Sequence, residues 1–128
     1  MALAKTKTLI LGTAGGKTAA ASGSTTLSDC TTIDTTSVIA LALDVSMNFN
    51  AAATQGALVK IFGSKDDTSW NNQPYDQFTI SFTGSVPLWR AHEFAVNPAP
   101  KYLKVMVTNS DTGQSITKIY VNAITQTA

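Results

Sequence analysis

The sequence is short of the residue types on which several classes of protein depend. Cys30 is the single cysteine and His92 the single histidine, which excludes a disulfide framework, a cysteine-based zinc site and a histidine-rich metal site. Charged residues are only 13% of the chain, and the net charge of +1 argues against a nucleic-acid partner. No apolar run is long enough for a membrane span, and the opening residues lack the order of a signal peptide. We therefore expect synthesis in a reducing cytoplasm.

The sequence is rich in small and β-branched residues. It has 19 threonines, 17 alanines and 11 serines, against a single glutamate, Glu93. Apart from alanine, strong helix formers are scarce, and threonine favours strands. The length of 128 residues suits one domain, and 44% hydrophobic residues suffice for a core.

Residues 36–128 alternate in the manner of β-strands. From Ile39 to Phe49 every odd position is apolar, a period of two that predicts one long, half-buried strand. Further strands are predicted at 58–62, 78–82, 86–96, 103–107 and 116–124. In the last the apolar parity shifts midway, which indicates a bulge or burial on both faces. Because no helical pattern lies between them, we expect an all-β fold, an antiparallel sandwich or jelly roll.

Residues 1–35 differ from this body. Glycines are frequent among alanine, serine and threonine, and the one strand signal covers residues 6–11. Lys5, Lys7 and Lys17 have no acidic neighbour in the sequence before Asp29. We therefore expect an extended N-terminal arm over 1–35, either a disordered leader or a segment that orders against a partner, and a sandwich domain over 36–128.

A glycine-rich segment at 12–18, GTAGGKT, is similar to a phosphate-binding loop. That motif requires a first glycine five residues before Gly16, and position 11 is Leu11. No amphipathic helix follows it. The segment therefore predicts a hinge, and no cofactor is expected.

The loop at 65–76 contains Asp66, Asp67 and Asp76 among several amides. Such oxygens suit Ca²⁺, but their spacing matches no EF-hand, and Asp and Asn also cap ordinary turns. Both readings stay open. Trp70, Tyr75 and Trp89 can cap the core, form a subunit interface or make a sugar-binding surface.

Catalytic residues are not evident. In a strand, His92 and Glu93 point to opposite faces, so they make no ready acid–base pair, and no nucleophile is marked for His92. The expectation is that the protein is not an enzyme.

Three segments carry a resemblance to known proteins: LDVSMNF at 43–49, VKIFGSKDDTSWNNQPYDQF at 59–78 and KYLKVMVTNSDTGQSITKI at 101–119. Across residues 36–126 the chain resembles small β-sandwich structural proteins of tailed bacteriophages, capsid decoration (cement) proteins in particular. The same pattern also occurs in carbohydrate-binding sandwiches. Another virion part, such as a neck, tail or baseplate subunit, is an alternative.

The resemblance implies a non-enzymatic protein on the capsid exterior that binds the major capsid protein across its joints, as a homo-oligomer such as a trimer. The arm would add a strand to a neighbour's sheet, with Leu9 and Leu11 in pockets and Lys5, Lys7 and Lys17 steering it to acidic surface. No small-molecule substrate, nucleic acid or membrane is implied.

Overall fold

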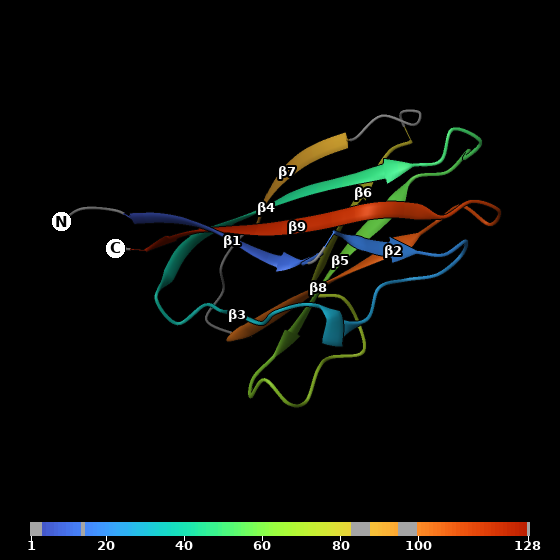
Figure 1. Cartoon of the computed structure of the whole chain (residues 1–128). Coiled ribbons are helices and arrows are strands. Elements are labelled where there is room, and N and C mark those ends of the chain that lie inside the picture. Colours follow the sequence, from blue (N-terminus) through green and yellow to red (C-terminus); the bar gives the residue numbers. More distant parts are fainter. Residues whose placement is uncertain (1–3, 14, 83–87, 95–99, 128) are drawn as a thin grey trace.

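The chain folds as two packed β-sheets, shown by a computed structural model that describes residues 4–13, 15–82, 88–94 and 100–127 (Figure 1). For 88–94 the backbone alone is described. A single turn of 3-10 helix, η1, covers Leu27–Asp29. The strands are β1 (Ala4–Leu11), β2 (Lys17–Ala19), β3 (Ile33–Asp34), β4 (Val38–Phe49), β5 (Ala57–Ser64), β6 (Asp76–Ile80), β7 (Leu88–Phe94), β8 (Tyr102–Asn109) and β9 (Ile116–Thr127).

The strand order is that of a jelly roll. One sheet has the order β1-β9-β4-β7, with β2 also paired to β9, and the other has the order β3-β8-β5-β6. The strands therefore pair from the two ends of the chain inward, as in one long hairpin that is wrapped around itself: β1 with β9, β3 with β8, β4 with β7 and β5 with β6. All these pairings are antiparallel, which confirms the predicted all-β sandwich.

The core lies between the sheets and follows the alternation in the sequence. In β4 the odd positions from Leu41 to Phe49 are buried, and Leu43 and Val45 have no exposed surface. In β8 Leu103, Val105 and Val107 face the same interior. Ile39 is the exception to the predicted run, because its side chain is 56% exposed at an end of β4 that the second sheet does not bury.

The segment 1–35 is not a separate arm in this structure. Its described part supplies β1 and β2 to one sheet and β3 to the other. The physical reason is that β9 would otherwise have an unpaired edge, and the few apolar side chains of the segment reach the core from there. Those buried in it are Ile10, Leu11, Ala19, Cys30 and Ile33.

The predicted irregularity in the last strand is present. The pairing of β4 with β9 shifts register between Ser46 and Asn48, and Lys118 opposite this shift has a positive φ of 51°. The bulge lies where the edge of β9 changes partner from β1 to β2.

One end of the sandwich, called the closed end below, comprises residues 20–23, 50–56 and 109–115. Asp111 is 5% exposed, and its carboxylate accepts hydrogen bonds from the backbone amides of Thr54 and Gln55 at 2.7 and 3.2 Å. It also accepts those of Gly113 and Gln114 at 2.8 and 2.9 Å. These amides, that of Thr54 foremost, lower the pKa of Asp111 to about 2. One carboxylate thus joins two loops that lie far apart in the sequence.

Candidate functional site

The opposite end of the sandwich, called the open end below, is the candidate site. It comprises residues 4–9 of β1, 38–40 of β4, 124–127 of β9 and the segment 31–37, and the first and last described residues, Ala4 and Thr127, pair there (Figure 1). Every residue from 4 to 9 is exposed, although successive side chains of a strand point to opposite faces. This part of the first sheet is therefore accessible from both sides.

The outer face of β1 at the open end carries three of the residues predicted to bind a partner. Lys5, Lys7 and Leu9 share this face, and the side chain of Leu9 is 37% exposed. The ammonium of Lys7 lies 3.5 Å from a carboxylate oxygen of Asp44 on β4, yet its side chain remains 56% exposed. The structure thus brings the three together on a solvent-exposed surface.

Leu11 does not join this surface. The strand is bulged between Leu9 and Leu11, and Leu11 is fully buried in the core of its own chain. In this conformation it is not available to fill a partner's pocket. The alternation in the sequence did not indicate the burial of Leu11, because a bulge at Ile10 turns the side chains of both Ile10 and Leu11 towards the core.

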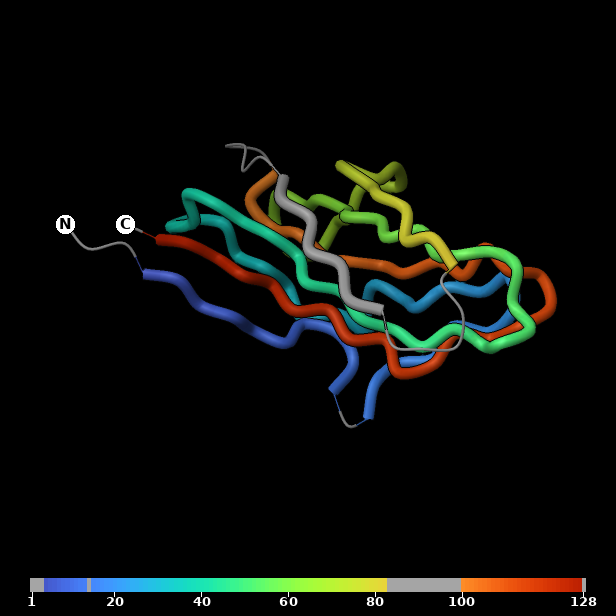
Figure 2. The backbone as a smooth tube through the Cα atoms, turned by 90° about the horizontal axis from the view of Figure 1, so that it is seen from above, coloured from blue at the N-terminus to red at the C-terminus, as the bar shows by residue number. Residues whose placement is uncertain are grey.

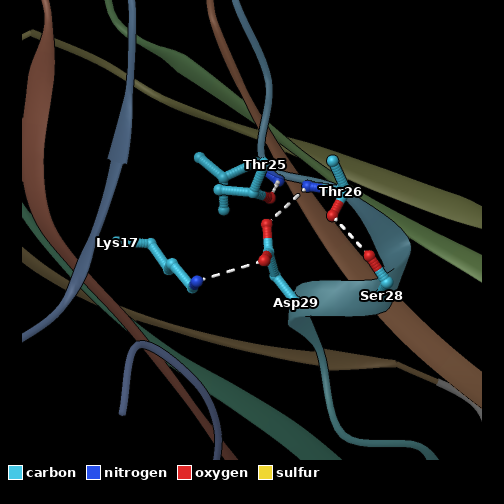
Figure 3. A network of polar contacts seen from close by, with 6 residues as sticks. Lys17, Thr25, Thr26, Ser28 and Asp29 are labelled. Atoms are coloured by element: carbon cyan, nitrogen blue, oxygen red, sulfur yellow. Dashed lines mark hydrogen bonds and ion pairs between the residues drawn. The ribbon is translucent and has the colours of Figure 1, made fainter. Parts of the chain in front are cut away.

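Lys17, the fifth of these residues, makes an internal contact. Its ammonium lies 3.1 Å from Asp29, whose second carboxylate oxygen accepts the amide of Thr26 at 2.9 Å (Figure 3). Beside them the hydroxyls of Thr26 and Ser28 are hydrogen-bonded at 2.9 Å. The Thr26 amide, and next Lys17, lower the pKa of Asp29. Lys17 therefore ties β2 to the turn at η1.

The glycine-rich segment is the connection between β1 and β2. Gly12 and Gly16 have positive φ angles of 102° and 88°, and the amide of Gly16 donates to the carbonyl of Gly12 at 2.9 Å. A Cβ at Gly12 would lie 2.2 Å from the carbonyl oxygen of Ile119, and one at Gly16 would lie 2.7 Å from Lys118. The chain crosses close over β9 here, which leaves no room for a side chain at Gly12 or Gly16. The glycine pattern that is similar to a phosphate-binding loop therefore has a structural cause.

A groove of about 420 Å³ opens at the open end, between the inner face of β1 and β9 and the segment 31–37. Its lining combines seven hydroxyl side chains with the carboxylate of Asp34 and four apolar side chains, Ile10, Ile33, Val38 and Ala123. The hydroxyl and the amide of Thr36 both donate to Asp34, at 2.6 and 3.0 Å, and lower its pKa.

The threonines of the groove were not recognised as site residues in the sequence. Thr8 lines it from β1, and Thr125 and Thr127 line it from β9. Thr6 pairs with Thr125 in the β1–β9 ladder. The available signal was the alternation of threonine in KTKT at 5–8 and ITQT at 124–127, which places these hydroxyls on one face of each strand.

The three aromatic residues do not form one described surface. Trp70 is partly buried, with the ammonium of Lys104 5.2 Å from its ring centroid, and it borders a hollow of about 480 Å³ with Lys65 and Asn71. Tyr75 packs against the core. Trp89 pairs through its backbone with Ser46, and its side chain lies outside the described residues.

The three carboxylates of the acidic loop accept hydrogen bonds from within the chain. Asp66 accepts the amides of Ser69 and Thr68 at 2.8 and 2.9 Å, which lower its pKa. Asp67 accepts the hydroxyl of Thr32 at 2.7 Å, and Asp76 accepts the amide of Gln77 at 2.8 Å. Across the described residues no three histidine, cysteine or acidic side chains gather as metal ligands.

The side chains of His92 and Glu93 lie outside the described residues. Cys30 is buried; its thiol donates to the carbonyl of Thr31 and accepts the amide of Val105, both at 3.3 Å. Burial raises the pKa of this thiol to about 11, so it stays protonated at neutral pH. In the part of the chain that the structure describes, no helix is long and apolar enough to cross a membrane.

No protein-family profile matches the sequence, and no curated protein matches it. Solved structures do. Dimeric latent PorU from Porphyromonas gingivalis superposes with a TM-score of 0.61 at 14% identity, over 99% of this chain. The chain spans only 13% of the length of PorU.

Two further structures match along nearly their whole length. The vertex protein P5 of PRD1 has a TM-score of 0.55 at 13% identity, over 96% of this chain and 95% of P5. The CBM36-1 domain of a multidomain xylanase from the hindgut metagenome of Trinervitermes trinervoides has a TM-score of 0.52 at 14% identity, over 94% and 96%. At such identities these likenesses establish the fold: the chain is an antiparallel β-sandwich domain.

Proposed function

We propose that the chain is a non-enzymatic structural protein of a bacteriophage virion, and that it decorates the exterior of the capsid. The observation that carries the proposal is the likeness to a phage vertex protein, which extends over 96% of this chain and 95% of P5. The exposed β1 at the open end supports a protein partner, because an unpaired strand edge readily pairs with another chain.

The mechanism of such a protein is physical. Each copy would bind across a joint between major capsid proteins and contribute a modest free energy. Many copies on one particle, grouped as closed oligomers such as trimers, would make the sum large through multivalency. The exposed Lys5 and Lys7 would speed association with acidic capsid surface, an effect that salt weakens.

The experiment is co-assembly with the major capsid protein encoded in the same genome. Capsids purified by gradient centrifugation should carry the chain at a fixed ratio and should melt at a higher temperature than capsids without it. Light scattering of the free chain gives its oligomeric state. Absence of the chain from purified capsids overturns the capsid assignment. If the chain instead co-purifies with neck, tail or baseplate particles, it belongs to that part of the virion.

A second candidate function, a carbohydrate-binding module, is favoured by one observation. Trp70 borders a hollow with polar neighbours, and a carbohydrate-binding domain shares the fold over 94% of this chain. A tryptophan beside such a hollow can stack on a sugar ring. This function predicts a change of tryptophan fluorescence on titration with xylan oligosaccharides or other glycans, abolished in Trp70→Ala. No change across a glycan panel would exclude it.

A further inference from the structure

We propose that the outer edge of β1, along residues 4–9, accepts an extended strand of a partner protein in which acidic and apolar side chains alternate. The apolar side chains of that strand enter the groove of the open end, and its carboxylates face Lys5 and Lys7. The inference rests on the proposed function only for the identity of the protein that supplies the strand.

The edge itself is the first ground. On one side β1 pairs with β9, from Ala4 opposite Thr127 to Leu9 opposite Asn122. On the other side no described strand pairs with residues 4–9, and Figure 2 shows β1 as the outermost strand beside β9. At Ile10 this edge meets the segment 31–37, because the carbonyl of Ile10 accepts the amide of Thr31 at 2.8 Å. Before Ile10, every second residue of β1 directs its backbone N–H and C=O away from β9, towards the edge that no described strand occupies.

The groove is the second ground. In a strand added to β1, every second side chain lies on the inner face, beside Thr6 and Thr8. Thr8 lines the groove, so these side chains enter a space of about 420 Å³ between the sheets. There a branched aliphatic side chain of the partner packs against Ile33 and Val38, and a small polar side chain can hydrogen-bond to the hydroxyls around them. Backbone pairing gives affinity in this mode, and the pocket gives specificity.

The charge of the outer face is the third ground, and it sets the partner's chemistry. Lys5 is exposed and, among the described residues, has no ion pair, while Lys7 remains accessible beside Asp44. Side chains directly opposite one another on paired strands lie roughly 5 Å apart. Glutamate or aspartate opposite Lys5 can therefore form a cross-strand ion pair, whereas Lys7 already has Asp44 as a partner and contributes only through its exposed side chain.

The same lysines disfavour a second copy of this chain as the occupant. Pairing β1 with β1 of another molecule would place the lysine-bearing outer faces side by side, and like charges on paired strands destabilise them. Charge complementarity therefore favours an acidic strand from a different protein.

The test uses the full chain and a dye-labelled synthetic peptide of about eight residues in which glutamate and valine alternate. Fluorescence anisotropy measures binding, and hydrogen exchange follows the amides of residues 4–9. Two peptides serve as comparisons: one with lysine in place of glutamate, and one of the same composition with all glutamates before all valines. Lys5→Glu and Thr8→Phe alter the two faces of the proposed site. Lys118→Glu and Thr117→Phe make the same changes at exposed positions elsewhere.

We expect the alternating acidic peptide to bind and to slow hydrogen exchange in residues 4–9. Lys5→Glu and Thr8→Phe should each weaken binding about tenfold or more, and Lys5→Glu should improve binding of the lysine peptide. Lys118→Glu and Thr117→Phe should change affinity by less than about twofold.

Three results would overturn the inference: no binding to the wild-type chain, equal binding of the block peptide, or a self-association that already protects residues 4–9. If Thr8→Phe fails to fold, the affinity of Lys5→Glu for the two charged peptides alone tests the inference. Because no capsid enters this experiment, the inference and the virion proposal can fail separately.

Discussion

The two ends of the sandwich are built differently although the same strands run through both. At the closed end, Asp111 holds the amides of two loops and Asn109 is 1% exposed, so polar groups are satisfied within the chain. At the open end, residues 4–9 are exposed and a groove separates β1 from the segment 31–37. The difference shows that polar groups are satisfied within the chain at the closed end, whereas the open end leaves groups exposed, as the proposed strand addition requires.

The largest expected effect contrasts two leucines of one strand. Leu11→Ala removes a fully buried side chain and should lower the free energy of unfolding by about 2–5 kcal/mol. Leu9→Ala, on the exposed outer face, should change it by less than about 0.5 kcal/mol. Urea denaturation measures both. Equal losses would show that the division between the core and the open end of β1 is wrong.

The next prediction concerns the carboxylates of the two ends. Asp111→Asn should lower the melting temperature by roughly 5–10 °C, because four backbone amides lose an ionised acceptor. Asp34→Asn, at the open end, should have a smaller effect, because Asp34 is exposed and the two hydrogen bonds described for it come from Thr36, two residues away. Calorimetry measures both melting temperatures. A larger fall for Asp34→Asn than for Asp111→Asn would contradict the comparison of the two ends.

Acid should act on the closed end through the same carboxylate. The pKa of Asp111 falls from the ordinary 3.8 to about 2 in the folded protein, so its stabilisation is fully present above 3.8 and is lost as pH falls towards 2. The melting temperature should therefore drop over this window. Asp111→Asn should show a shallower drop, with Asp29, Asp34 and Asp66, whose pKa values are also lowered, supplying the rest.

A smaller effect is expected where β1 crosses to β2. Gly12→Ala and Gly15→Ala both place a side chain at a φ near 100°, which costs roughly 1–3 kcal/mol. Gly12→Ala adds a clash with the Ile119 carbonyl, whereas nothing lies within 4 Å of a Cβ at Gly15. Gly12→Ala should therefore be the more destabilising in urea. The reverse order would contradict the close crossing over β9.

The smallest effect is expected for the partly exposed ion pair of Lys17 and Asp29. Lys17→Met should lower the free energy of unfolding by roughly 0.2–1 kcal/mol in low salt and by less in high salt. Lys5→Met, which removes the same charge from a lysine without such a pair among the described residues, is the control. A salt-independent loss would point to packing of the Lys17 stem.

Much of the fold followed from the alternation of apolar residues. The run at 39–49 predicted β4, and its odd positions from Leu41 onward form part of the core. The bulge in β9 was visible as a change of apolar parity. The short strands β2 and β3 were not predicted, because a strand of two or three residues has no periodicity to detect.

The candidate site was predicted less well. Lys5, Lys7 and Leu9 lie together on the outer face of β1, but Leu11 turns into the core and Lys17 pairs with Asp29. Deleting residues 1–24, the natural test of a free arm, would remove β1, β2 and buried side chains such as Ile10. Point variants at the open end are therefore the informative tests.

The sequence by itself determined the longer strands and most of their buried faces, because the alternation of side chains along a strand is a local property of the backbone. Tertiary structure decided the rest. Whether residues 4–11 would be a free arm or the edge of a sheet depended on β9, more than 100 residues away, offering an unpaired edge. The groove likewise exists because β1 and the segment 31–37 come to the same end of the molecule, a proximity that no local pattern encodes.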